Sequence, residues 1–126
     1  MELREAIRYD LNDLPGDKRD FRLLSCQLDF IPELRGTLVN VSLKGFGIEI
    51  DGITGSQVQN IQSMDAFMIT IFFNDDSLVV GVKNIWNRIL FEKGAMIYKG
   101  GLAIEIISSE DRLKLSGIIG TIRHNR

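Results

Sequence analysis

The most informative stretch for the fold is Gly101-Leu102-Ala103-Ile104-Glu105-Ile106-Ile107-Ser108-Ser109-Glu110-Asp111-Arg112. Large apolar side chains alternate with smaller or charged ones over residues 102–106, which is the pattern of a half-buried strand. The period then lengthens to that of a helix, with apolar side chains at Leu115, Ile118, Ile119 and Ile122. Residues 108–111 supply a serine cap and acidic side chains for the first helical turn. The stretch predicts a closing strand followed by a C-terminal helix with one buried face.

The chain before this stretch contains short β-rich runs separated by turn residues. The expected strands span residues 23–30, 36–41, 46–50, 67–73, 78–88 and 89–98. Lys99-Gly100-Gly101 is expected to turn the chain into the closing strand, and the polar residues 52–63 to form a long loop or an irregular helical turn. The aromatic side chains expected in the core are Phe67, Phe72, Phe73, Trp86 and Phe91. About seven strands result, so the protein is expected to be mainly β.

The N-terminal residues differ from the rest of the chain in their pattern. Apolar residues recur at intervals of four, four and three between Leu3 and Leu14, which predicts a short amphipathic helix. Pro15-Gly16-Asp17 would end it. We therefore expect a helical or flexible segment over residues 1–16 and a single domain over residues 17–126.

The composition suits one globular domain, with 126 residues, 44% hydrophobic and 25% charged. Cys26 is the single cysteine, which favours a reducing compartment over a disulfide framework. The sequence shows neither a signal-peptide pattern nor an apolar run of membrane-spanning length, so we expect a cytoplasmic protein without membrane insertion. A net charge of −2 argues against a nucleic-acid-binding surface.

Catalytic and metal-binding patterns are missing from the sequence. His124 is the single histidine and is one of the last three residues, where a solvated side chain is expected. The sequence contains no Cys/His cluster, no phosphate-binding glycine loop of the Walker kind and no Gly-x-Ser-x-Gly. We therefore expect neither an enzyme nor a metal site.

Two polar stretches go beyond what a plain barrel requires. Lys18-Arg19-Asp20-Phe21-Arg22 carries three cations within five residues, just before the first expected strand. In Asn40-Val41-Ser42-Leu43-Lys44-Gly45, strand alternation would put Asn40 and Ser42 on one side. Taken alone, the first stretch also fits a solvated connector and the second a turn. Together they could supply an anion-binding arm and a hydrogen-bonding rim, which suit a guanine nucleotide.

These two stretches resemble the motifs of the PilZ family, Arg-x-x-x-Arg and Asp/Asn-x-Ser-x-x-Gly, in the same order and at a similar separation. Residues 101–112 resemble the family's closing strand and helix entry, so the likeness covers residues 18–122. The resemblance implies a six- or seven-stranded antiparallel β-barrel with a C-terminal α-helix. It also implies binding of the bacterial second messenger cyclic di-GMP, with no further cofactor.

The resemblance implies a nucleotide site made of Lys18, Arg19, Arg22, Asn40, Ser42 and Gly45. The Arg22 guanidinium can stack on guanine and donate two hydrogen bonds, with Arg19 assisting. Asn40 offers an amide oxygen to the guanine edge, Ser42 a hydroxyl, and Gly45 a tight backbone turn.

The expected function is that of a cyclic di-GMP effector or adaptor. Residues 17–22 would close over the nucleotide and change the surface offered to an unidentified protein partner, in a monomer or a dimer. Lys18 stands where the family pattern has arginine, and lysine lacks the planar guanidinium. The alternative is therefore a PilZ-like interaction module that binds no nucleotide. An oligonucleotide-binding barrel is disfavoured by the acidic composition.

Overall fold

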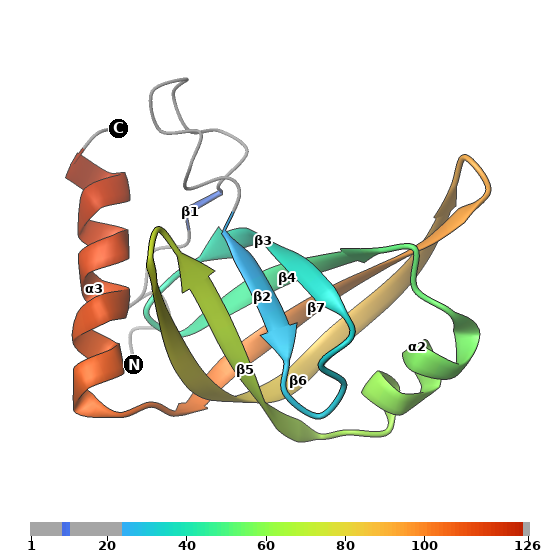
Figure 1. Ribbon diagram of the computed structural model, residues 1–126, viewed down its shortest axis with the longest axis horizontal. Helices are drawn as coiled ribbons and strands as arrows, with labels where there is room; N and C mark the ends of the chain where they lie inside the picture. The colour runs from blue at the N-terminus through green and yellow to red at the C-terminus, as the bar shows by residue number, and fades with distance from the viewer. Residues whose placement is uncertain (1–8, 11–23, 125–126) are drawn as a thin grey trace, which may run out of the picture.

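The structure, a computed structural model, describes residues 9–10 and 24–124 of the chain (Figure 1). The elements are β1 (Tyr9–Asp10), β2 (Ser25–Leu28), β3 (Arg35–Val41), β4 (Gly45–Asp51), α2 (Gly55–Gln62), β5 (Ala66–Phe73), β6 (Asp76–Glu92), β7 (Ala95–Ile106) and α3 (Ser109–His124). Residues 55–62, expected as a loop or a helical turn, are a helix, because Thr54 and Gln57 form a capping box at its start.

The strands form one antiparallel sheet that closes into a barrel. Its order is β1-β3-β2-β5-β6-β7-β4, and a further pairing of β3 with β4 joins the two sides. Six strands thus make the barrel, and β1 is an additional short strand on β3. The predicted antiparallel barrel with a C-terminal helix is confirmed. The strand at Tyr9–Asp10 contradicts a helix running through those two residues, and the rest of the segment 1–16 lies outside the described residues.

Helices α2 and α3 lie at opposite ends of the barrel (Figure 1). α3 buries the predicted apolar stripe, and α2 buries Val58 and Ile61. The stripe consists of Leu115, Ile118, Ile119 and Ile122. Cys26 is fully buried among the core side chains, and burial raises the pKa of its thiol to about 12. No helix in the described part of the chain is long and apolar enough to cross a membrane.

Polar contacts attach α3 to the start of β6. The Lys114 ammonium donates to Asp76 Oδ1 and to the Ser77 carbonyl, each at 3.0 Å. The Val79 backbone N–H donates to Asp111 Oδ2 at 3.2 Å. The Ser77 backbone N–H and the Lys114 ammonium lower the pKa of the Asp76 carboxyl. The helix therefore has a fixed place against the barrel.

Strands β6 and β7 are longer than the sequence predicted. Residues 78–88 and 89–98, expected as two strands, belong mostly to the single strand β6, and no turn occurs at residues 99–101. The turn lies at Lys93-Gly94, where φ is 52° and 78°. Gly100 and Gly101 are glycines for a different reason, because a Cβ at either position would collide with the ring of Tyr98 or Trp86. The expected turn glycines make room for aromatic side chains within a strand.

The aromatic side chains divide between the core and the surface. Phe67 is buried and the half-buried Phe73 packs against the core, as expected. Phe72 is half-buried but lies outside the core, where the Arg35 guanidinium carbon is 4.3 Å from the centre of its ring. Trp86 and Phe91 are 47% and 75% exposed, so their expected place in the core is wrong. The outward position of Trp86 matters for the site described next.

Candidate functional site

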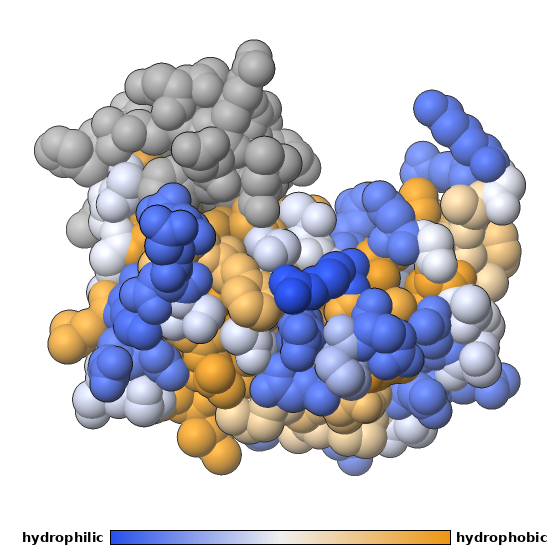
Figure 2. Space-filling view, viewed as in Figure 1, coloured by the Kyte–Doolittle hydropathy of each residue, from blue (hydrophilic) through white to orange (hydrophobic). Residues whose placement is uncertain are grey.

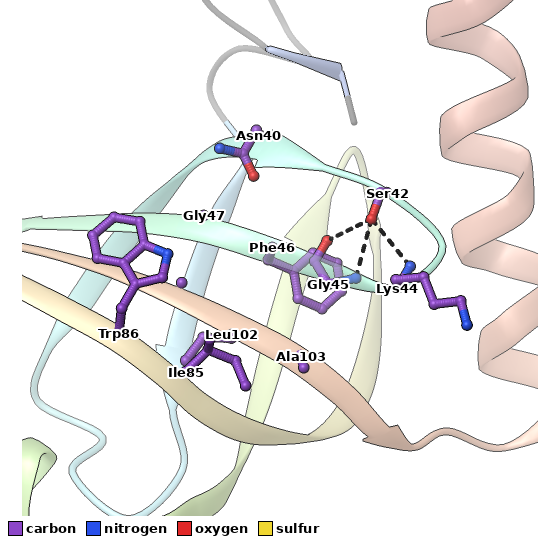
Figure 3. Close-up of a pocket in the computed structure, with 11 residues that line it drawn as sticks. Asn40, Ser42, Lys44, Gly45, Phe46, Gly47, Ile85, Trp86, Leu102 and Ala103 are labelled. Carbon is purple, nitrogen blue, oxygen red and sulfur yellow. Dashed lines mark hydrogen bonds between the residues drawn. The ribbon is translucent and has the colours of Figure 1, made fainter. Parts of the chain in front are cut away.

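A pocket of about 230 Å³ lies on the outer surface of the barrel, over β3, β4, β7 and β6 (Figure 3). Its lining residues are Asn40, Ser42, Lys44, Gly45, Phe46, Gly47, Ile85, Trp86, Gly101, Leu102 and Ala103. The pocket is lined by one end of the β3–β4 hairpin and by the facing parts of β6 and β7.

One cross-strand row of residues forms the centre of the pocket. Asn40 pairs with Gly47, Gly47 with Gly101, and Gly101 with Trp86. Two glycines thus make the floor, with Asn40 at one end of the row and the indole at the other. A Cβ on Gly47 would lie 2.5 Å from Asn40 Nδ2, and one on Gly101 would lie 2.1 Å from Trp86 Nε1. Both side chains lie directly against glycine backbone, and any larger residue would displace them.

Two β-bulges turn Asn40 and Trp86 toward the pocket. The register of β3 shifts between Leu38 and Asn40, and that of β6 shifts between Asn84 and Trp86. Each shift inserts one extra residue, which reverses the alternation of the residues that follow it. Without the insertion at Ile85, Trp86 would continue the inward series Val80, Val82 and Asn84. The bulges therefore assemble the pocket walls.

The Ser42 side chain shapes the turn between β3 and β4. Its Oγ accepts hydrogen bonds from the backbone N–H groups of Lys44 and Gly45, both at 3.1 Å, and donates to the Gly45 carbonyl at 3.4 Å (Figure 3). One hydroxyl donates one hydrogen bond and accepts two, so its capacity is used within the turn. Gly45 is needed for close packing, because a Cβ there would lie 2.1 Å from the Leu102 carbonyl oxygen.

The side-chain amide of Asn40, unlike the Ser42 hydroxyl, makes no hydrogen bond within the turn. Among the described residues, it takes part in no hydrogen bond, and its side chain is half-buried at the pocket. An amide offers two donor hydrogens and an acceptor oxygen. The Asn40 side-chain amide can therefore serve a bound ligand without breaking a hydrogen bond to any described residue.

The structure brings together half of the predicted site. Asn40, Ser42 and Gly45 all line the pocket, whereas Lys18, Arg19 and Arg22 lie outside the described residues. The prediction missed Trp86, the neighbouring Ile85 and the glycine floor. One sequence signal pointed to them, since the adjacent large residues Ile85-Trp86 interrupt the apolar alternation of β6. In the described part of the chain, no group of His, Cys, Asp or Glu could hold a metal ion.

Solved structures show the same architecture. The PilZ domain of YcgR from Escherichia coli, with cyclic di-GMP, superimposes with a TM-score of 0.65 at 16% identity, covering 98% of this chain and 93% of that one. This chain has the PilZ fold. The resemblance to the PilZ family expected from the sequence is confirmed at the level of the fold, a β-barrel with a C-terminal helix.

Two longer proteins are also similar to this PilZ-fold chain. The Bacillus subtilis inhibitor of motility MotI (DgrA) gives a TM-score of 0.62 at 18% identity over 100% of this chain. The Borreliella burgdorferi PlzA protein, in complex with cyclic di-GMP, gives 0.59 at 11% identity over 98%. This chain spans about half the length of both, 54% in each case. No family model and no curated protein matches the sequence.

Proposed function

We propose that this PilZ-fold chain is a cyclic di-GMP-binding module without enzymatic activity. The observation that carries the proposal is the row Asn40-Gly47-Gly101-Trp86. In it, two bulges place an exposed indole and a side-chain amide, which has no hydrogen-bond partner among the described residues, around a glycine floor. Two of the similar structures contain cyclic di-GMP, which supports this choice of ligand.

The pocket chemistry suits a guanine base. The Trp86 indole offers an aromatic face on which a base can stack, and such stacking contributes about 1–3 kcal/mol. The Asn40 amide can exchange hydrogen bonds with the polar edge of guanine. The volume of about 230 Å³ is smaller than that of a typical ligand cleft of roughly 300–1,000 Å³, so the pocket accommodates part of the dinucleotide.

The phosphates require cations from beyond the pocket floor. Lys44 lines the pocket at the β3–β4 turn. In this proposal Lys18, Arg19 and Arg22 supply further positive charge, and the segment 17–22 closes over the nucleotide. Closure changes the surface next to the pocket, through which a protein partner in the bacterial cytoplasm is signalled. Ordering that segment costs conformational entropy, which the phosphate contacts must exceed.

Isothermal titration with cyclic di-GMP tests the proposal. We expect saturable binding, weakened about 5- to 150-fold by Asn40→Ala, since a good base-edge contact contributes about 1–3 kcal/mol. Trp86→Ala should weaken binding by a similar factor. Leu113→Ala is the control, because Leu113 is also an exposed large apolar residue but lies on α3, outside the pocket. Absence of saturable binding in the unmodified protein would reject the proposal and favour the nucleotide-independent interaction module.

A further inference from the structure

The hairpin of β6 and β7 extends beyond the body of the barrel. β5 pairs with β6 only as far as Lys83, and the Asp65 carbonyl accepts the Asn84 N–H at 2.8 Å. From Ile85 to Glu92, β7 is the one strand that pairs with β6 among the described residues. β4 pairs with the other side of β7 as far as Ile97, so only the last pairs of the hairpin, Phe91–Met96 and Glu92–Ala95, are two-stranded. This end of the hairpin, the ribbon, closes at the Lys93-Gly94 turn and stands away from the body (Figures 1 and 2).

The free edge of the ribbon belongs to β6. On the β7 side, the backbone N–H groups of Gly52 and Ile53 both donate to the Met96 carbonyl, at 3.1 and 3.3 Å. On the β6 side, α2 reaches as far as Asn87, whose Oδ1 accepts from Gln62 Nε2 at 2.8 Å. Residues 88–92 extend past that contact. Within the part of the chain that the structure describes, they form an unpaired strand edge, which proteins usually protect with charges, prolines or a covering segment.

The side chains of this edge are apolar at its centre and charged at both ends. Ile89, Leu90 and Phe91 lie between Arg88 and Glu92, and Phe91 is 75% exposed. Within the described residues, neither Arg88 nor Glu92 belongs to a salt bridge.

Neither Arg88 nor Glu92 is neutralised by the residue opposite it in β7. Arg88 lies opposite Lys99, and like charges in that position are destabilising. Lys99 in turn is 3.7 Å from Glu49 Oε2. Glu92 lies opposite Ala95. Opposite charges at both ends of an uncharged centre are therefore left for a partner to neutralise.

We propose that this β6 edge binds a second copy of the same chain, strand to strand and antiparallel, around Leu90. The sequence Arg88-Ile89-Leu90-Phe91-Glu92 is complementary to itself in that arrangement. Arg88 meets the partner's Glu92, Ile89 meets the partner's Phe91, and Leu90 meets the partner's Leu90. Opposite-charge and apolar cross-strand pairs are the favourable kinds, and every position is matched.

The two faces of the joined ribbons are matched separately. Ile89 packs toward the core side, and strand alternation places Phe91 with it, so these two residues and their partner equivalents form one apolar cluster. On the opposite face, the paired Leu90 side chains lie between the two Arg88–Glu92 ion pairs. The same register brings the Lys93-Gly94 turn of each copy opposite Asn87 and Trp86 of the other, next to the pocket.

The dimer should be transient. Five paired residues bury less surface than the roughly 1,600 Å² of a typical stable interface. A β-strand from a different protein is the other possible occupant of the edge. The self-complementary charges favour a second copy, because a foreign strand would gain nothing from that symmetry.

Sedimentation velocity over a concentration series, on the ligand-free chain, tests the proposal. We expect a monomer–dimer equilibrium that is weakened at least tenfold by Arg88→Glu or by Glu92→Arg, since each places like charges opposite each other. The double variant, Arg88→Glu with Glu92→Arg, exchanges the two charges and should restore dimerisation. Circular dichroism melting confirms that each variant is folded.

Cross-linking provides a second readout. Leu90→Cys puts a thiol at the two-fold axis, and an oxidant should convert that variant to a covalent dimer. Cys26 can stay in place, because it is fully buried. Leu113→Cys is the control, since Leu113 is an equally apolar residue, 74% exposed, on α3.

Three results would overturn the proposal. They are a chain that stays monomeric at submillimolar concentration, a charge exchange that fails to restore the dimer, and equal cross-linking rates for the two cysteine variants. The first would leave the edge to a strand of another protein. Since no nucleotide is present in these experiments, their failure says nothing against the binding of cyclic di-GMP.

Discussion

Replacing Gly101 with alanine should displace the Trp86 indole from the wall of the pocket. A Cβ at this position would lie 2.1 Å from Trp86 Nε1, and all of its three nearest atoms belong to the indole. Ordinary contacts between such atoms are about 3.5–4.0 Å, so the ring has to move by about 1.5 Å or more. Because Trp86 is 47% exposed, the indole can swing outward without displacing core residues.

The expected energies follow from this movement. Leaving a favourable rotamer costs about 0.5–1.5 kcal/mol, so Gly101→Ala should lower the free energy of unfolding by about 1 kcal/mol. Loss of a base stacked on the indole is worth about 1–3 kcal/mol, which corresponds to about 5- to 150-fold weaker cyclic di-GMP binding. Affinity should therefore fall much more than stability.

Two measurements check this prediction. Trp86 is the single tryptophan, so its emission reports the movement of the ring directly, and calorimetric titration reports the affinity. Gly117→Ala is the matched control, because a Cβ there meets nothing within 4 Å. It should raise stability by about 1 kcal/mol through helix propensity and leave the emission unchanged. Unchanged emission and affinity in Gly101→Ala would refute the role assigned to the glycine floor.

Three further predictions concern stability. Gly45→Ala should destabilise the fold by at least about 2 kcal/mol in chemical denaturation, because its Cβ would meet the Leu102 backbone oxygen at 2.1 Å and backbone cannot swing away. Burial raises the pKa of Tyr98 to about 12, so the protonated phenol favours the folded state. The free energy of unfolding should therefore fall as the pH rises from about 10 to about 12. In chemical denaturation over that pH range, Tyr98→Phe should lack this part of the loss. The Ser77 backbone N–H and the Lys114 ammonium lower the pKa of the Asp76 carboxyl. The carboxylate therefore stabilises the folded state at neutral pH, and this stabilisation is lost as the pH falls through the lowered pKa. Melting curves at acid pH should show a smaller loss of stability for Asp76→Asn than for the unmodified protein.

Local patterns predicted the elements whose residues decide their own structure. The helix period between Leu115 and Ile122 gave α3 correctly, and the β-rich runs between residues 23 and 73 correspond to β2 to β5. Asn40, Ser42 and Gly45 of the Asn-x-Ser-x-x-Gly stretch lie together at the β3–β4 turn and line one pocket. In each case, short-range periodicity and the final packing agree.

Errors arose where side-chain packing or pairing between strands decides the structure. Gly100 and Gly101 look like turn glycines in the sequence, but the rings of Tyr98 and Trp86 require them in mid-strand. The outward position of Trp86 depends on a register shift against β7, which alternation within β6 alone does not reveal. The size of the pocket likewise depends on four strands meeting in one row, so it could not be predicted from one segment at a time.

The bulges in β3 and β6 also affect how this protein can change during evolution. In a regular strand, side chains alternate between the two faces without interruption. One residue therefore cannot change face unless every residue after it changes face as well. The extra residues Val39 and Ile85 separate each strand into two stretches with opposite alternation. Substitutions at Asn40 or Trp86 can therefore change the shape and polarity of the pocket without disturbing the interior. Deletion of Ile85 would instead exchange the inner and outer sides of β6 from Trp86 onward, so loss of a single codon would abolish the site where many substitutions would only modify it.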